Sequence, residues 1–135
     1  MSLFHAEYKV KISFEDLDPM NIVWHGNYMR YLEQARCDMF SKLNYSYKEM
    51  YNDGIAYPIA KISAKYIKPA ILGDTLIIKS EIISIEPSLD IKYNVYNNES
   101  GEKIFEASTM QIAIDFNTKQ SLYNAPKSLK EAIGV

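Results

Sequence analysis

Hydrophobic and polar residues alternate near the start of the chain, between Glu7 and Phe14. Four apolar side chains fall on one side and three polar side chains on the other: Tyr8, Val10, Ile12 and Phe14 against Lys9, Lys11 and Ser13. This period of two residues is typical of a strand with one buried face. Acidic residues and Pro19 break the pattern between residues 15 and 21, which predicts a loop.

The hydrophobic period changes after Gly26. Apolar residues then recur at steps of three and four positions, which is the spacing of one helical face: Tyr28, Leu32, Ala35, Met39 and Leu43. We therefore predict a long amphipathic helix over residues 27–43, with Asn27 as its candidate N-cap. A short second helix is expected between residues 44 and 53.

Three residues within the long helix have structural interpretations. Glu33 and Arg36 lie one helical turn apart, so we expect them to form an ion pair. Cys37 has no histidine at local spacing, and we interpret it as a small packing residue.

Beyond Gly54 the chain has the pattern of strands separated by turn residues. We expect strands over residues 59–68, 75–86, 89–96 and 103–115. Short turns favour antiparallel neighbours, so the element order predicts an α+β fold in which one helix covers a five-stranded antiparallel sheet. In the tail, residues 116–135, we expect a short helix from Ser128 and assign no function.

Composition narrows the class of protein. The chain has 135 residues, 47% hydrophobic and 24% charged, which favours one globular domain over residues 1–135. Its net charge of -2 argues against a nucleic-acid binder. One cysteine cannot form an internal disulfide, and neither a secretory leader nor an apolar run long enough to span a bilayer is evident. We therefore expect a cytoplasmic protein with no membrane span.

The densest polar cluster lies between the first strand and the long helix. It contains three carboxylates, one of the two histidines and the only tryptophan: Glu15, Asp16, Asp18, His25 and Trp24. A helix N-terminus offers unsatisfied N–H groups that can polarise a carbonyl, and a nearby carboxylate can attack that carbonyl or activate water. Acidic residues before a helix are also common as caps, so the residue types alone leave both interpretations open.

Other kinds of site find less support. The acidic run lacks a spaced His or Cys partner set and the glycine and terminal glutamate of a calcium loop, so we expect no metal. No Gly-rich phosphate loop or Gly-x-Ser-x-Gly elbow is present. Lys61, Lys65 and Lys68 could meet phosphates or an acidic carrier protein at a sheet edge, although such lysines usually form a solvated face.

A resemblance to a known family favours the catalytic interpretation. Residues 15–28 read EDLDPMNIVWHGNY and continue into YLEQAR at residues 31–36. This segment resembles the signature of hotdog-fold acyl-CoA thioesterases, in the branch of 4-hydroxybenzoyl-CoA thioesterase and the Tol-Pal-associated thioesterases. The similarity continues through Tyr66 to Ala70 and Gly73-Asp74, and with the element order it covers nearly the whole chain. The resemblance implies a hotdog fold, with the antiparallel sheet wrapped around the central helix.

The resemblance also implies roles for individual residues. Asp18 matches the catalytic aspartate, as nucleophile on the thioester carbonyl or as general base for water. His25 matches the position whose backbone N–H polarises that carbonyl, and its imidazole could orient water or protonate the leaving thiolate. Trp24, Gly26 and Asn27 are implied as substrate-binding positions.

The activity expected from the resemblance is hydrolysis of an acyl-CoA, or of an acyl group on a carrier protein, without a bound cofactor. An unpaired sheet edge is a liability, and hotdog subunits commonly pair along one with their sites between them, so we expect a homodimer or homotetramer. Two alternatives remain: a hotdog hydratase or dehydratase, and a non-catalytic acyl-thioester-binding sensor.

Overall fold

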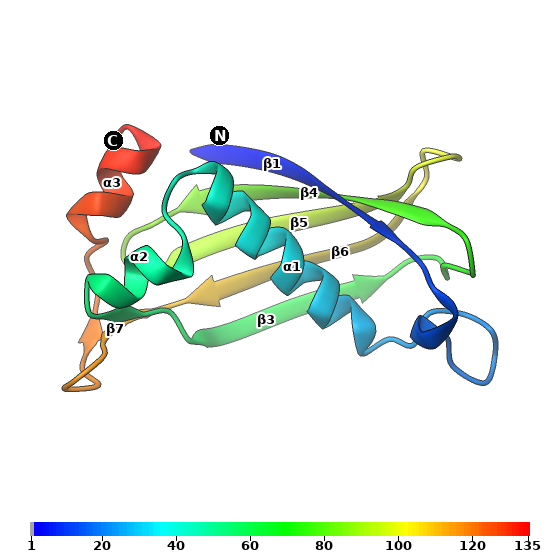
Figure 1. Ribbon diagram of the computed structural model, residues 1–135, viewed down its shortest axis with the longest axis horizontal. Coiled ribbons are helices and arrows are strands. Elements are labelled where there is room, and N and C mark those ends of the chain that lie inside the picture. The colour runs from blue at the N-terminus through cyan, green and yellow to red at the C-terminus, as the bar shows by residue number, and fades with distance from the viewer. Residues whose placement is uncertain (1) are drawn as a thin grey trace.

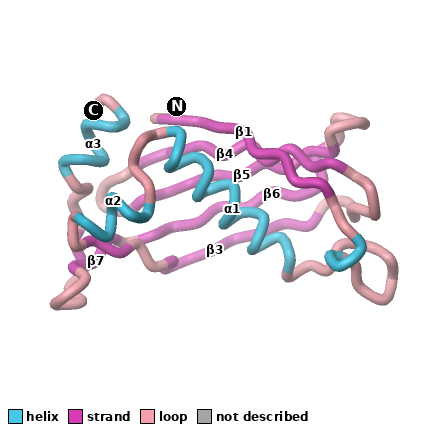
Figure 2. Tube along the Cα trace, in the orientation of Figure 1, coloured by secondary structure: helices cyan, strands magenta, loops and turns pink. Residues whose placement is uncertain are grey.

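The computed structural model describes residues 2–135, and its centre is a five-stranded antiparallel sheet in the order β1-β4-β5-β6-β3. Figures 1 and 2 show the sheet with the long helix α1, Asn27–Lys42, lying diagonally across one face. The sheet strands are β1 (Phe4–Lys11), β3 (Ile59–Tyr66), β4 (Thr75–Ser84), β5 (Leu89–Asn97) and β6 (Lys103–Gln111). The predicted α+β arrangement is confirmed.

Helix α1 buries the face that its hydrophobic period predicts. Five apolar residues at that spacing are each at most 5% exposed: Tyr28, Leu32, Ala35, Met39 and Leu43. They pack on the inward-facing residues of the strands, among which Leu76, Ile78, Tyr93 and Phe105 are fully buried. Burial of one apolar side chain contributes about 1.5–3 kcal/mol, so this two-layer core is the main source of stability.

The first strand ends earlier than its alternating pattern predicts. β1 stops at Lys11, and the 3-10 turn η1 occupies Phe14–Asp16. Phe14, which we expected on the buried face, is 80% exposed, whereas Ile12 is buried as expected. The turn forms because the Asp16 carboxylate accepts hydrogen bonds from the Ser13 backbone and hydroxyl, which curls the chain away from the sheet.

The predicted strand over residues 103–115 is in fact two strands. β6 ends at Gln111, and β7 (Ala113–Asp115) joins a separate three-stranded sheet with β2 (Ile55–Ala56) and β8 (Ser121–Leu122). At the break the Ile112 N–H donates to the Pro58 carbonyl at 3.3 Å. The chain thus changes its pairing partner from β3 to β2, which periodicity alone does not reveal.

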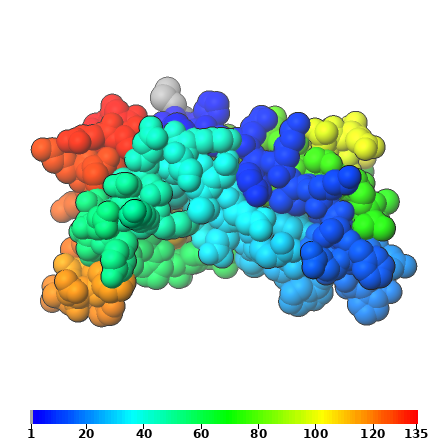
Figure 3. All heavy atoms as spheres, viewed as in Figure 1, coloured from blue at the N-terminus to red at the C-terminus, as the bar shows by residue number. Residues whose placement is uncertain are grey.

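Two short helices complete the fold, α2 (Tyr47–Asn52) and α3 (Lys127–Ile133), and both agree with the sequence expectation to within a few residues. Leu129 of α3 is fully buried, and Glu86 holds this segment by accepting from the Ala125 N–H and pairing with Lys130. In the space-filling view of the helical side, α3 lies at one end of the molecule and the loop after β1 at the other (Figure 3).

Two interpretations of the middle of α1 are wrong. Arg36 does not pair with Glu33. Its guanidinium is buried and donates to the Tyr47 hydroxyl at 3.0 Å and the Tyr93 hydroxyl at 3.2 Å. Cys37 is exposed rather than packed. The helix is rotated so that position 36 faces the sheet and position 37 faces solvent.

Strand β3 forms one edge of the sheet, and all eight of its residues are exposed. Ile62 and Tyr66 pair with Thr109 and Phe105 of β6, both buried, so they point to the side that carries α1. Among residues 2–135, no helix is long and apolar enough to cross a membrane.

Candidate active site

Asp18 is the first residue of a tight loop that connects Leu17 to Val23. Leu17 and Val23 form an isolated bridge, and between them the Asp18 N–H donates to the Ile22 carbonyl at 2.8 Å. Asn21 closes the loop at a φ of 63°, in the left-handed region that asparagine tolerates better than most residues. The loop therefore fixes the backbone from which the Asp18 carboxylate projects.

The two oxygens of the Asp18 carboxylate differ. Oδ1 accepts hydrogen bonds from the N–H groups of Met20 at 2.8 Å and Ile22 at 3.4 Å. Oδ2 has no hydrogen-bond partner within residues 2–135. The backbone thus orients the carboxylate through one oxygen and leaves the other available to a substrate or water.

Asp16, the first acid of the motif, has a structural role. It is 4% exposed, accepts from Ser13, and pairs with Arg30 at 2.5 Å. Burial by itself would raise the pKa of this carboxyl, but the hydrogen bonds from Ser13 and Arg30 outweigh burial and lower the pKa below its usual value. Asp16 therefore remains ionised and buried, while Asp18 is the acid left for chemistry.

The carbonyl of Asp16 fixes the start of α1. It accepts from the Trp24 N–H at 3.0 Å and from the Asn27 side-chain amide at 2.8 Å. Gly26, not Asn27, is the N-cap of α1, and it makes no side-chain cap. The prediction that Asn27 caps the helix is thus wrong, because its amide is used to tie the helix to the 3-10 turn.

Trp24 lies directly on Gly26. A Cβ placed on Gly26 would come within 2.4 Å of two indole carbons, so the indole can pack this closely only because position 26 is glycine. The indole is half exposed, and its ring centroid lies 5.2 Å from that of His25. Trp24 therefore covers the turn that leads into α1.

A hollow of about 360 Å³ brings Asp18 and His25 together at the start of α1. Its lining is Asp18, Met20, Ile22, Val23, His25, Tyr28, Tyr66, Ile67, Lys68 and Pro69. Trp24, Gly26 and Asn27 are adjacent to this lining but not part of it. Their contact with substrate stays a prediction.

The lining adds Tyr66, for which the sequence predicted no role, and Lys68, which the sequence grouped with Lys61 and Lys65. Tyr66 donates its hydroxyl to the His25 carbonyl at 2.9 Å, and Lys68 pairs with Glu102. Both belong to the second segment that resembles the thioesterases. Their proximity to Asp18 is visible only in the structure, where the end of β3 lies beside the loop before α1.

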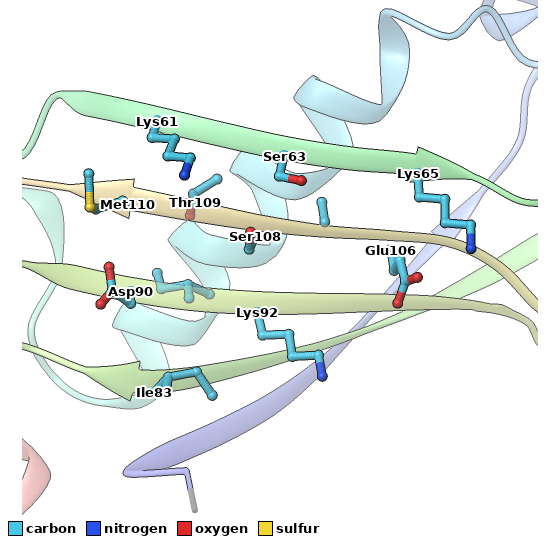
Figure 4. Close-up of a pocket in the computed structure, with 12 residues that line it drawn as sticks. Lys61, Ser63, Lys65, Ile83, Asp90, Lys92, Glu106, Ser108, Thr109 and Met110 are labelled. Carbon is cyan, nitrogen blue, oxygen red and sulfur yellow. The ribbon is translucent and has the colours of Figure 1, made fainter.

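A larger hollow, of about 580 Å³, lies on the opposite face of the sheet, with α1 behind it (Figure 4). Its charged residues are of both signs: Lys61, Lys65, Lys92, Asp90 and Glu106. The three lysines predicted as one patch are therefore divided, because Lys68 lines the Asp18 hollow instead. This mixed surface offers no candidate nucleophile beside a helix start, so we place the candidate active site at Asp18.

Asp18 is the candidate reactive group of this hollow. Within residues 2–135, no cluster of three His, Cys, Asp or Glu side chains could hold a metal ion. Asp18, whose Oδ2 has no hydrogen-bond partner within residues 2–135, lines the same hollow as His25, which lies just before the 16-residue helix α1. This pairing suits attack on a carbonyl whose developing negative charge is stabilised by backbone N–H groups.

Comparison with known proteins identifies the family. The model of the thioesterase-like superfamily matches residues 12–133. Acyl-CoA thioester hydrolase YbgC of Escherichia coli O6:H1 is 28% identical over 127 residues, which cover 93% of this chain and 90% of YbgC. Putative acyl-CoA thioesterase YneP of Bacillus subtilis strain 168 is 27% identical over 111 residues, which cover 82% of this chain and 80% of YneP.

The fold agrees with this relationship. The crystal structure of DHNA-CoA thioesterase from Staphylococcus aureus matches with a TM-score of 0.81 and 28% identity, covering 88% of this chain and 80% of that chain. The hotdog fold expected from the sequence is confirmed. The family match, the helix across an antiparallel sheet and the acid beside the helix start together identify this chain as a hotdog-fold member of the thioesterase-like superfamily.

Proposed function

We propose that the protein hydrolyses an acyl-CoA thioester to a free carboxylic acid and CoA, with Asp18 as the catalytic carboxylate. The observation that carries this proposal is that Asp18, whose Oδ2 has no hydrogen-bond partner within residues 2–135, lines the hollow at the start of α1. Relatives that are aligned over most of their length carry the names acyl-CoA thioester hydrolase and putative acyl-CoA thioesterase, which supports the same substrate class.

The carboxylate can act by either of two routes. As a nucleophile, Asp18 forms a bond to the thioester carbonyl carbon, the C–S bond breaks, CoA thiolate leaves, and water then hydrolyses the mixed anhydride. As a general base, Asp18 takes a proton from water, whose oxygen attacks the same carbon. Both routes place negative charge on the carbonyl oxygen, end in acid and thiol, and need no bound cofactor.

The neighbouring residues serve this reaction in different ways. We assign the His25 backbone N–H as a donor to the thioester oxygen and the His25 imidazole as the group that protonates the leaving thiolate or orients water. Trp24 and Gly26 shape the entrance beside the reacting carbonyl, and Asn27 holds that entrance against Asp16. A cytoplasmic location stays a prediction that rests on the sequence.

Thiol release from a panel of acyl-CoAs, acetyl to palmitoyl plus benzoyl, tests the proposal with Asp18→Asn as the key variant. Asparagine keeps an oxygen for the Met20 and Ile22 N–H groups, so the loop is retained while the carboxylate is lost. We expect kcat to fall by about 10²- to 10⁴-fold with KM nearly unchanged. Glu15→Gln, an exposed acid of the same loop outside the hollow, is the matched control and should keep full activity.

Near-parental turnover by Asp18→Asn would refute the assignment of Asp18. Turnover by neither protein on any acyl-CoA would direct the assay to the same acyl groups on acyl carrier protein. If both proteins then bound acyl-CoA equally without hydrolysis, the binding-sensor alternative would replace the enzyme.

We further propose that two copies pair through β3 as a homodimer. Within residues 2–135 the outer edge of β3 is unpaired, and its helix-side residues Ile62 and Tyr66 are 43% and 49% exposed. An open edge with apolar side chains is a template for pairing with another strand. Because Tyr66 also lines the Asp18 hollow, such a dimer has its sites beside the subunit interface.

A further inference from the structure

The turn that precedes α1 holds two backbone N–H groups without acceptors. The Trp24 N–H donates to Asp16, the Asn27 N–H to Trp24 at 2.9 Å, and the Tyr28 N–H to His25 at 3.4 Å. Within residues 2–135, the N–H groups of His25 and Gly26 have no hydrogen-bond acceptor. His25 lines the hollow and Gly26 lies beside its lining, so both N–H groups are candidates to bind water or the substrate oxygen.

The carbonyl of His25 and the N–H of Gly26 belong to one peptide unit. This unit is trans, so its C=O and N–H point in opposite directions. The Tyr66 hydroxyl donates to the His25 oxygen at 2.9 Å. A hydrogen bond at the oxygen therefore fixes the direction of the Gly26 N–H and polarises it, because hydrogen bonds in a chain strengthen one another.

Aromatic packing holds Tyr66 in place for this contact. Its ring meets Tyr28 edge-on with centroids 5.4 Å apart, and Phe105 with centroids 4.9 Å apart. Tyr28 and Phe105 are themselves buried and stacked at 4.4 Å. Partial burial raises the pKa of the Tyr66 phenol above its usual value, so at neutral pH the hydroxyl keeps the proton that it donates.

We propose that Tyr66 is a positioning residue that orients the Gly26 N–H as a second donor to the thioester oxygen, beside the His25 N–H. This inference rests on the proposed function, which it extends from the helix start to the end of β3. Tyr66 acts through the His25–Gly26 peptide and takes no part in bond making or breaking. Two aligned donors stabilise the developing oxyanion more than one donor does.

Tyr66→Phe tests the proposal, because it removes the hydroxyl and keeps the ring that packs on Tyr28 and Phe105. We expect kcat to fall about ten-fold, less than the 10²- to 10³-fold typical for complete loss of an oxyanion donor, since the N–H remains but is no longer held. KM and the affinity for the S-alkyl-CoA thioether of the preferred chain should stay within about two-fold, because the thioether has no carbonyl oxygen.

A second readout does not depend on turnover. The carbonyl ¹³C resonance of His25 reports its hydrogen bond, so Tyr66→Phe should shift it, together with the Gly26 amide resonance. Tyr51→Phe is the matched control: it removes an exposed hydroxyl on α2 that makes no hydrogen bond with residues 2–135, and it should change neither resonances nor kcat.

The outcomes separate this inference from the proposed function. Unchanged kcat, an unmoved His25 resonance, or a loss seen only in KM would each overturn the positioning role while Asp18-dependent hydrolysis stands. Absence of hydrolysis by the parental protein, on acyl-CoAs and on the same acyl groups carried by acyl carrier protein, would overturn both. Loss of kcat together with a shifted resonance, at unchanged thioether affinity, is the supporting result.

Discussion

Arg30, in the first turn of α1, pairs with the carboxylate of Asp16 in the preceding 3-10 turn, with 2.5 Å between Nη2 and Oδ1. Asp18, two residues after Asp16, forms no ion pair within residues 2–135, and its Oδ2 accepts no hydrogen bond from them. The two aspartates of the Asp-x-Asp motif therefore have different roles. Asp16 fastens the loop to α1, and Asp18 presents a carboxylate to the hollow.

Asp16→Asn should destabilise the protein in a pH-dependent way. The pKa of Asp16 is lowered in the folded state relative to its ordinary value of 3.8, so its stabilisation is present at neutral pH and is lost as pH falls through the folded-state pKa. We expect a loss of about 1–2 kcal/mol in the free energy of unfolding at pH 7, modest because Arg30 is half exposed. Urea unfolding at pH 7 and below pH 3.8 measures it. A difference from the parent that does not shrink in acid would contradict this assignment.

His25→Ala should reduce activity less than Asp18→Asn does. Alanine keeps the backbone N–H at position 25 and removes only the exposed imidazole. We expect kcat to fall by about ten-fold, below the 10²- to 10⁴-fold typical for loss of a general acid or base, because the backbone N–H remains. Steady-state thiol release on the preferred acyl-CoA checks this. A loss as large as that of Asp18→Asn would make the imidazole, not the N–H, the essential part of His25.

Gly26→Ala should impair activity through Trp24. The backbone of Gly26, at φ -67° and ψ -22°, accepts alanine without strain, but the new Cβ would lie 2.4 Å from the indole. Because the indole is half exposed and can swing away, we expect a stability change below about 1 kcal/mol and a several-fold fall in kcat/KM. In a Trp24→Ala background the same substitution should add almost nothing. Additive effects in this double-mutant cycle would rule out the contact as the cause.

Glu33→Ala and Arg36→Ala should differ sharply, although both residues lie on α1. Glu33 is exposed and forms no ion pair within residues 2–135, so its removal should change the free energy of unfolding by less than about 0.5 kcal/mol. Arg36 supplies the donors to Tyr47 and Tyr93, and its loss should cost about 2–4 kcal/mol. Chemical denaturation of the two variants measures the contrast. Equal losses would restore the ion pair that the sequence suggested.

Ile62→Lys should convert the proposed dimer to a monomer, because it places a charge on the helix-side face of the open β3 edge. Light scattering after size-exclusion chromatography gives the mass directly. Ile83→Lys is the matched control, since Ile83 is 41% exposed on the outer face of β4, and it should leave the mass unchanged. A parental protein that elutes at 15.6 kDa would refute the dimer.

Local patterns in the sequence were sufficient for most of the fold. The spacing of apolar residues from Tyr28 to Leu43 predicts α1 to within one residue, because the buried residues of a helix recur at every turn. The sequence did not predict the strand ends that depend on hydrogen bonds with other parts of the chain. Phe14 leaves the sheet because Ser13 bonds to Asp16, and Ile112 separates two strands because Pro58 takes its N–H.

The candidate site could be predicted in part. Asp18 and His25 were found through resemblance, and they do line one hollow. No spacing in the loop distinguishes Asp16 from Asp18, since the difference depends on Arg30, fourteen positions away. Tyr66 is forty-one positions from His25, so its contact exists only once β3 lies beside the loop.

The indole on Gly26 gives the protein an optical reporter. The chain contains a single tryptophan, so its tryptophan fluorescence comes from Trp24 alone, at the turn that begins α1. A thioester that binds at the adjacent hollow, as proposed, should alter the surroundings of this one fluorophore. Occupancy of the site can thus be followed in unlabelled protein, before and apart from any bond cleavage.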